Sequence, residues 1–174
     1  MSAAPPVNAT AAALLGLLHD GPRTGGQLVA EAGERFGAFF SVTRSQIYRE
    51  LPALAAAGLT KPGEQGARAS QKYAITAAGR RAFRTWLAAG SGTDALRSPL
   101  VLRLLHAEAL PEDGRDELVR AARDAYRERL AGERAAVRAA KDPVQRAVAE
   151  FSVAHTRAVL KLLDAVSDAC RPPA

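Results

Sequence analysis

Residues 41–58 read SVTRSQIYRELPALAAAG and predict one helix with both ends marked. Thr43 and Gln46 have the spacing of a capping box, which begins a helix by satisfying free backbone N–H groups. Gly58 provides the left-handed conformation that ends a helix, and Pro52 predicts a kink or a strained turn inside it. The apolar side of this helix consists of residues at helical spacing: Ile47, Leu51 and Leu54.

The other side of the first two turns carries hydroxyls, amide and guanidinium donors and one aromatic ring, with no acid before Glu50. These residues are Thr43, Arg44, Ser45, Gln46, Tyr48 and Arg49. A helix N-terminus attracts phosphate through its dipole, and Arg and Gln side chains can reach base edges in the DNA major groove. The stretch favours a DNA-reading helix, although a solvated amphipathic helix shows the same pattern.

Positive charge is concentrated in the first half of this 174-residue chain, whose net charge is +6. Residues 1–90 hold ten Lys and Arg against five Asp and Glu, whereas residues 91–174 hold fourteen against thirteen. A basic excess around the Thr43 helix is what an anionic partner requires. The abundant Ala and the low aromatic content of 5% predict a mainly helical protein.

The sequence gives no support to catalytic or metal-binding classes. Cys170 is the single cysteine, so an internal disulfide and a multi-cysteine metal site are excluded. His19, His106 and His155 are scattered, and no glycine-rich phosphate loop, nucleophile motif or dinucleotide fingerprint occurs. We therefore expect no enzyme activity, metal or cofactor. The absence of a membrane-spanning run and of a signal sequence leads us to expect a cytoplasmic protein.

The segments around the Thr43 helix predict a winged helix-turn-helix domain over residues 10–90, after a flexible arm at residues 1–9. Residues 10–19 predict a short buried helix, and Thr24 caps a second one that runs to about Phe36. The aromatic residues Phe36, Phe39 and Phe40 are expected to fill the core beneath the third helix. Residues 59–62 and 71–75 are strand-like and flank a polar turn, and Thr76 caps a fourth helix. The wing would contact phosphates through Arg68 and Lys72, with Lys61 as a further candidate.

Five short runs in this domain resemble the PadR family of bacterial transcriptional regulators: LLGLL at 14–18, GQL at 26–28, SQIYREL at 45–51, AGL at 57–59 and YAITAAG at 73–79. The most specific are the Gln-Ile-Tyr run and the Tyr-x-Ile-Thr-x-x-Gly run. The sequence departs from the family at residues 25–28, where Gly-Tyr-Glu-Leu is usual. The resemblance implies a sequence-specific regulator and makes a small phenolic or drug-like aromatic effector conceivable.

Residues 91–98 read as a linker, and residues 99–174 predict an all-helical domain. A short helix over 100–110 precedes two long helices, over 116–141 and from Asp142 to about Asp168. The last helix carries an apolar stripe that could pair with the preceding helix or with a second copy of the chain. The PadR resemblance implies a helical C-terminal dimerisation domain, whose contacts we assign to Phe151, Val159, Leu162 and Val166.

The sequence as a whole predicts a homodimeric repressor that binds a near-palindromic operator in double-stranded DNA. Arg44, Gln46 and Arg49 are the candidates for base edges, and Ser45 and Tyr48 for the DNA backbone, although Tyr48 could instead be half-buried. An effector could contact Phe83, Trp86 and Tyr126, for which core packing or a dimer interface is the plainer explanation. A winged helix that binds only proteins is the alternative function.

Overall fold

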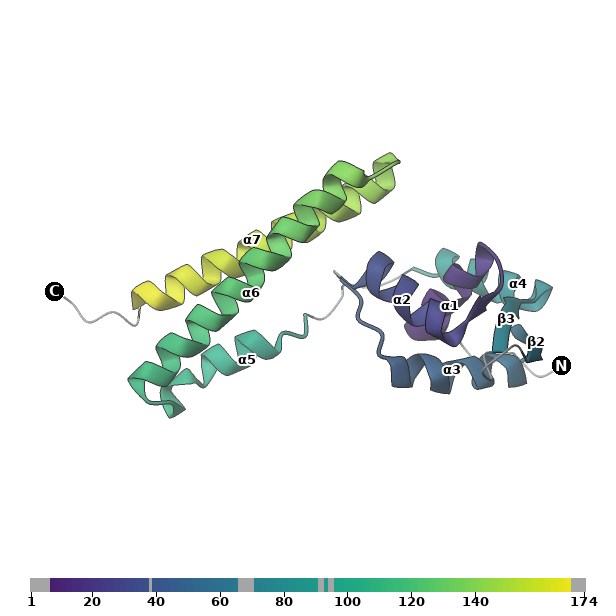
Figure 1. The fold of residues 1–174 in the computed structure, drawn as a ribbon, viewed down its shortest axis with the longest axis horizontal. Helices are drawn as coiled ribbons and strands as arrows, with labels where there is room; N and C mark the ends of the chain where they lie inside the picture. The colour runs from purple at the N-terminus through teal and green to yellow at the C-terminus, as the bar shows by residue number, and fades with distance from the viewer. Residues whose placement is uncertain (1–6, 38, 66–70, 91–92, 94–95, 170–174) are drawn as a thin grey trace. The chain divides into compact units, whose positions relative to one another are not determined.

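The computed structural model describes residues 7–37, 39–65, 71–90, 93 and 96–169. The chain divides into two compact units, Met1–Thr93 and Asp94–Ala174 (Figure 1). Helices dominate both units, and a small three-stranded sheet belongs to the first. The predicted fold class, a winged helix followed by a helical C-terminal region, is confirmed.

The helices of the first unit begin at side-chain caps. They are α1 (Ala9–His19), α2 (Gly25–Phe36), α3 (Arg44–Ala56) and α4 (Ala77–Ala88). Both α2 and α3 begin at capping boxes, formed by Thr24 with Gln27 and by Thr43 with Gln46. The α3 helix continues through Pro52 as one element, and the residues after it reach Gly58, whose φ is 70°. The helix boundaries predicted from caps are therefore close to those of the structure.

One hydrophobic core joins the four helices. Leu14, Leu15, Leu17 and Leu18 of α1 are fully buried, together with Leu28 of α2 and with Ile47 and Leu51 of α3. Phe36 packs partly against this core, but Phe39 is 52% exposed. The expectation that all three aromatic residues before α3 fill the core is wrong for Phe39, because the connector carries its ring to the surface.

The sheet consists of β1 (Arg23–Thr24), β2 (Thr60–Gln65) and β3 (Gln71–Ile75), in the antiparallel order β1-β3-β2. Thr60 pairs with Ile75 and Pro62 with Tyr73, and the register shifts between Pro62 and Gln65. The strand β2 thus extends three residues beyond the predicted end at Pro62. The two-residue strand β1 was not predicted, because so short a run carries no alternation pattern.

A compact junction locks the end of α3 to the start of α4. The Thr76 hydroxyl donates a hydrogen bond to the Gly58 carbonyl at 2.7 Å and accepts one from the Gly79 N–H at 3.0 Å. A Cβ on Gly79 would overlap the carbonyl oxygen of Leu59. Two of the runs that resemble the PadR family, AGL and YAITAAG, therefore meet at one contact and orient α3 relative to the wing.

The second unit contains α5 (Pro99–Leu105), a short 3-10 helix (Ala107–Ala109), α6 (Glu112–Ala139) and α7 (Pro143–Ala169). The helices α6 and α7 lie side by side as an antiparallel hairpin (Figure 1). As predicted, Asp142 caps α7, accepting from the Gln145 N–H at 2.9 Å. Within the part of the chain that the structure describes, no helix is long and apolar enough to cross a membrane.

The seam between α6 and α7 is narrow and partly polar. Its buried residues are Val119, Leu130 and Glu133 of α6 and Ser152, Val153, Thr156 and Leu163 of α7. Most of the apolar stripe expected on α7 faces away from this seam: Phe151 is 61% exposed and Leu162 is 37% exposed. None of the residues of α5 is buried. The second unit therefore leaves much of its apolar surface in solvent.

Candidate nucleic-acid interface

The helix α3 has two chemically different sides. Ile47, Leu51 and Leu54 are buried in the core and fix the helix to α1 and α2. The residues on the opposite side of its N-terminal half are exposed: Thr43, Arg44, Ser45, Tyr48 and Arg49. The helix therefore presents its N-terminal end, with free donors and the positive end of the helix dipole, to solvent.

The capping box at the start of α3 restricts what Gln46 can do. The Thr43 hydroxyl accepts from the Gln46 backbone N–H at 3.2 Å, and the Gln46 side-chain oxygen accepts from the Thr43 backbone N–H at 2.8 Å. That oxygen is the group which would accept a hydrogen bond from adenine N6 in a bidentate contact. Reading adenine in that way would break half of the capping box, so Gln46 has only its amide nitrogen to offer outward.

Tyr48 lies on the surface and connects α3 to α2. Its side chain is 47% exposed, and a Cβ on Gly25 would lie 3.0 Å from two of its ring carbons. The Arg44 guanidinium lies 5.4 Å from the ring centroid, within cation–π range. Tyr48 is thus half-exposed, and it positions Arg44. Sequence reasoning missed the role of Gly25, since no spacing relates residue 25 to residue 48.

The wing carries two exposed lysines. Lys61 of β2 pairs with Ala74, and Lys72 of β3 is two residues from Ala74, so both lysines project from the same face of the sheet. Both are exposed, whereas the neighbouring Ile75 points into the core. Arg68, the other predicted wing contact, lies outside the described residues. Lys61, the further candidate from the sequence, therefore lies on the same face of the sheet as Lys72.

In the described part of the first unit, the acids that form ion pairs do so with arginines outside α3 and the wing. Asp20 pairs with Arg35 at 2.9 Å, and Glu31 pairs with Arg23 at 2.6 Å. Arg35 also lowers the pKa of Asp20, chiefly through its hydrogen bond to the carboxylate. Among the described residues, no carboxylate forms an ion pair with the cations of α3 and the wing, which are Arg44, Arg49, Lys61 and Lys72.

The residues considered for an effector belong to different environments. Phe83 of α4 packs against α1, where a Cβ on Gly16 would lie 3.2 Å from its ring. Trp86 is partly exposed near the end of α4. Tyr126 belongs to α6 of the second unit, and its ring lies 5.9 Å from the Arg129 guanidinium. Phe83 is therefore used in packing, and Trp86 is the more accessible ring on α4.

The residues assigned to dimerisation occur along α7. Phe151 and Leu162 are exposed, whereas Val159 and Val166 are half-buried. Because exposed positions alternate with covered ones, α7 offers a second apolar face in addition to the one that contacts α6.

Residues 14–85 match the model of the transcriptional regulator PadR-like family. Among solved structures, Bacillus subtilis PadR in complex with operator DNA is 19% identical, with coverage of 93% of this chain and 98% of that chain and a TM-score of 0.74. The PadR-like regulator BC1756 from Bacillus cereus is 20% identical, covering 91% and 96%, with a TM-score of 0.75. The Vibrio cholerae virulence activator AphA is 23% identical, covering 91% and 95%, with a TM-score of 0.65.

No curated protein sequence matches the chain significantly. At these identities the structural matches show a common fold that extends over both units. The family match spans α2, α3, the wing and most of α1 and α4, which are the elements that build the exposed surface of α3. The resemblance drawn from the five sequence runs is thereby confirmed, and the chain carries a winged-helix domain of the PadR-like family of transcriptional regulators.

Proposed function

We propose that this protein is a sequence-specific DNA-binding repressor that acts as a homodimer. The observation that carries the proposal is the exposed N-terminal face of α3. There Arg44 and Arg49 have no carboxylate partner among the described residues, while the opposite side of the helix is fixed in the core. Rigid placement of unpaired guanidiniums at a helix N-terminus suits insertion into a major groove.

Each part of the surface has a distinct role in this proposal. Arg44 and Arg49 contact base edges or adjacent phosphates, and Gln46 supports them through its free amide nitrogen. Thr43, Ser45 and Tyr48 bind the DNA backbone. Lys72 and Arg68 of the wing neutralise phosphates and so add affinity without sequence preference.

The proposed dimer forms through the second unit. Each large apolar side chain left in water forfeits about 1.5–3 kcal/mol, and α7 exposes Phe151 and Leu162 in the single chain. In a symmetric dimer, the α7 helix of each copy covers Phe151 and Leu162 of the other, with Val159 and Val166 at the edge of the contact. The dimer would place two α3 helices about 34 Å apart, in successive major grooves of a near-palindromic operator.

Regulation would act through that spacing. Bacillus subtilis PadR has been solved with operator DNA and with p-coumaric acid, which makes DNA and a small aromatic effector reasonable partners for this chain. An effector relieves repression if it binds better to a dimer whose α3 helices are wrongly spaced. Trp86 and Tyr126 are the candidate contacts, and Phe83 would act through the packing of α4.

A gel shift on the DNA upstream of the protein's own gene tests the proposal. We expect a discrete complex that Arg44→Ala or Arg49→Ala weakens, while the control Arg146→Ala on exposed α7 leaves it unchanged. Absence of any complex with duplex DNA, even at low salt, would contradict the proposal and favour a protein-interaction module. Transcription from that DNA with and without the protein distinguishes repression from activation.

A further inference from the structure

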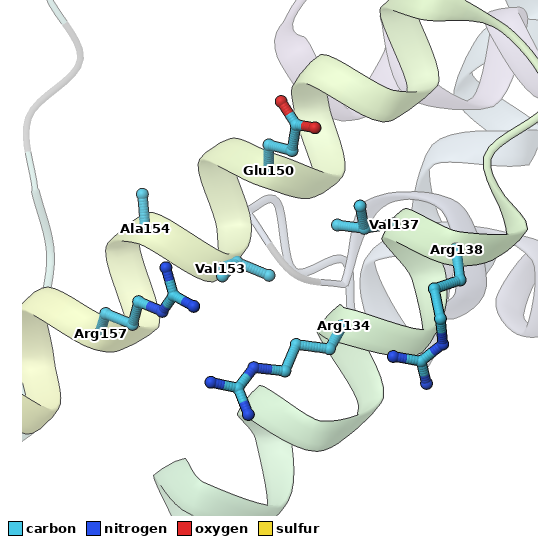
Figure 2. Close-up of a pocket in the computed structure, with 7 residues that line it drawn as sticks. All are labelled: Arg134, Val137, Arg138, Glu150, Val153, Ala154 and Arg157. Carbon is cyan, nitrogen blue, oxygen red and sulfur yellow. The ribbon is translucent and has the colours of Figure 1, made fainter.

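A groove of about 350 Å³ lies between α6 and α7, close to the turn that joins them (Figure 2). Its apolar lining consists of Val137, Val153 and Ala154. Arginine side chains form its cationic edge, with Arg134 and Arg138 from α6 and Arg157 from α7. None of its lining residues belongs to α3 or is one of the aromatic residues considered above.

The charges around this groove are not balanced within the described part of the chain. Arg134, Arg138 and Arg157 form no ion pair there, and Glu150 is the one carboxylate of the lining. Glu133 does not neutralise its neighbour Arg134, because it pairs with Arg129 at 2.8 Å. Arg134 and Arg138 stand four residues apart on one helix, a spacing at which like charges repel. An anion in the groove would relieve that repulsion.

The arrangement of the lining defines the shape of that anion. In Figure 2 the guanidinium groups of Arg134 and Arg157 lie on the same side of the groove, and Val137 and Val153 point toward each other between the helices. The valines lie one helical turn nearer the joining turn than these two arginines, a rise of about 5.4 Å. A carboxylate held by the two guanidiniums would therefore direct its apolar body over the valines.

The lining also favours an aliphatic ligand chain over a planar aromatic one. It contains short aliphatic side chains and no aromatic ring on which a planar ligand could stack. The volume is near the lower end of small-molecule sites, which span roughly 300–1,000 Å³. A short unbranched chain fits along the groove between the two helices, whereas a bare inorganic anion would make no contact with its apolar lining.

We propose that this groove binds a short- to medium-chain aliphatic carboxylate. Arg134 and Arg157 hold the carboxylate, Val137 and Val153 contact the alkyl chain, and Arg138 adds long-range attraction. The proposal does not depend on DNA binding, so its failure and that of the proposed function are distinguishable.

Isothermal titration of the full chain with sodium octanoate, below its micelle concentration and without DNA, tests this site. We expect one octanoate per chain, and binding at least about tenfold weaker for acetate and for neutral 1-octanol, each of which lacks half of the contacts. Arg134→Gln and Arg157→Gln should each weaken octanoate binding roughly tenfold or more. Arg146→Gln, which changes an exposed arginine of α7 outside the groove, should not.

Three results would overturn the proposal. One is the absence of octanoate binding to the unaltered chain. Another is equal binding of 1-octanol, which would show that apolar contact alone holds the ligand, without use of the arginines. The third is equal weakening by Arg146→Gln, which would indicate attraction by net charge alone. The three substituted residues, Arg134, Arg146 and Arg157, are exposed. Each variant should therefore have the same circular dichroism spectrum as the unaltered chain.

Discussion

The two units of this protein solve the problem of burying apolar surface differently. In the first unit, side chains from four helices and β3 meet in one core around the buried leucines of α1. In the second, α6 and α7 meet along a seam that includes the buried polar residues Glu133, Ser152 and Thr156, and α5 buries none of its residues. The first unit can therefore hold α3 rigidly by itself, whereas the second has apolar surface to offer to another chain.

The largest expected effect comes from breaking the second unit. Leu162→Asp places a charge on the proposed contact, where two such side chains meet in a dimer, at a cost of about 1.5–3 kcal/mol for each lost apolar contact. We expect the sedimentation mass to fall to that of one chain and the affinity for operator DNA to fall with it. Lys161→Asp, at the adjacent exposed position, is the control. A Leu162→Asp protein that remains dimeric would show that the contact lies elsewhere.

Changes in the first unit should alter its free energy of unfolding rather than dimerisation. In Gly79→Ala the new Cβ overlaps the Leu59 carbonyl, and the resulting strain should lower the free energy of unfolding by about 1–3 kcal/mol. Gly33→Ala adds a methyl group with nothing within 4 Å and should stabilise α2 by up to about 1 kcal/mol. Urea unfolding measures both. Equal stability of the two variants would mean that the junction between α3 and α4 yields easily.

Contacts on the α3 surface should separate specificity from general affinity. Arg44→Ala is expected to cost about 1–3 kcal/mol on the operator and to relax preference at particular base pairs. Lys72→Ala should weaken binding to all duplexes alike and reduce the salt dependence by about one ion. Fluorescence anisotropy on operator and random DNA at several salt concentrations measures both effects. Equal losses on the two DNAs for Arg44→Ala would mean that this side chain only positions the protein.

The smallest effect concerns the exposed ion pair at the end of α1. The pKa of Asp20 is lowered by its hydrogen bond to Arg35, so its contribution to stability is present above the pKa of the unfolded chain and disappears as the pH falls through the folded value. Asp20→Asn should reduce stability slightly at pH 7 and not at pH 2 in urea unfolding. The difference at pH 7 should also disappear when Arg35 is already Gln.

Local signals made much of the first unit predictable. The capping boxes at Thr24 and Thr43 and the left-handed Gly58 determine backbone geometry within a few residues, and the structure contains all three. The contact of Tyr48 with Gly25 was not predictable, because it depends on how α2 and α3 cross. The two-residue strand β1 is created by its pairing with β3.

The second unit shows where periodicity stops being informative. The apolar stripe of α7 predicts contact with the preceding helix or with a second copy, but it does not predict that Ser152 and Thr156 are buried. Both side chains are small enough to allow close helix packing. Side-chain size is not part of the apolar periodicity, so the pattern cannot predict this contact. The same limit applies to the arginine-edged groove, since Arg134 and Arg157 are far apart in sequence and become neighbours only in the hairpin.

The spacing of the two proposed half-sites is the most direct test of the account. After hydroxyl-radical footprinting has located the half-sites, five base pairs inserted between them would rotate one half-site by about half a helical turn. Because one dimer must place two α3 helices about 34 Å apart on the same face of the duplex, affinity should fall to the level of a single half-site. Ten inserted base pairs restore the face but not the distance, so binding should remain weak. Unchanged affinity after the five-base-pair insertion would contradict the account.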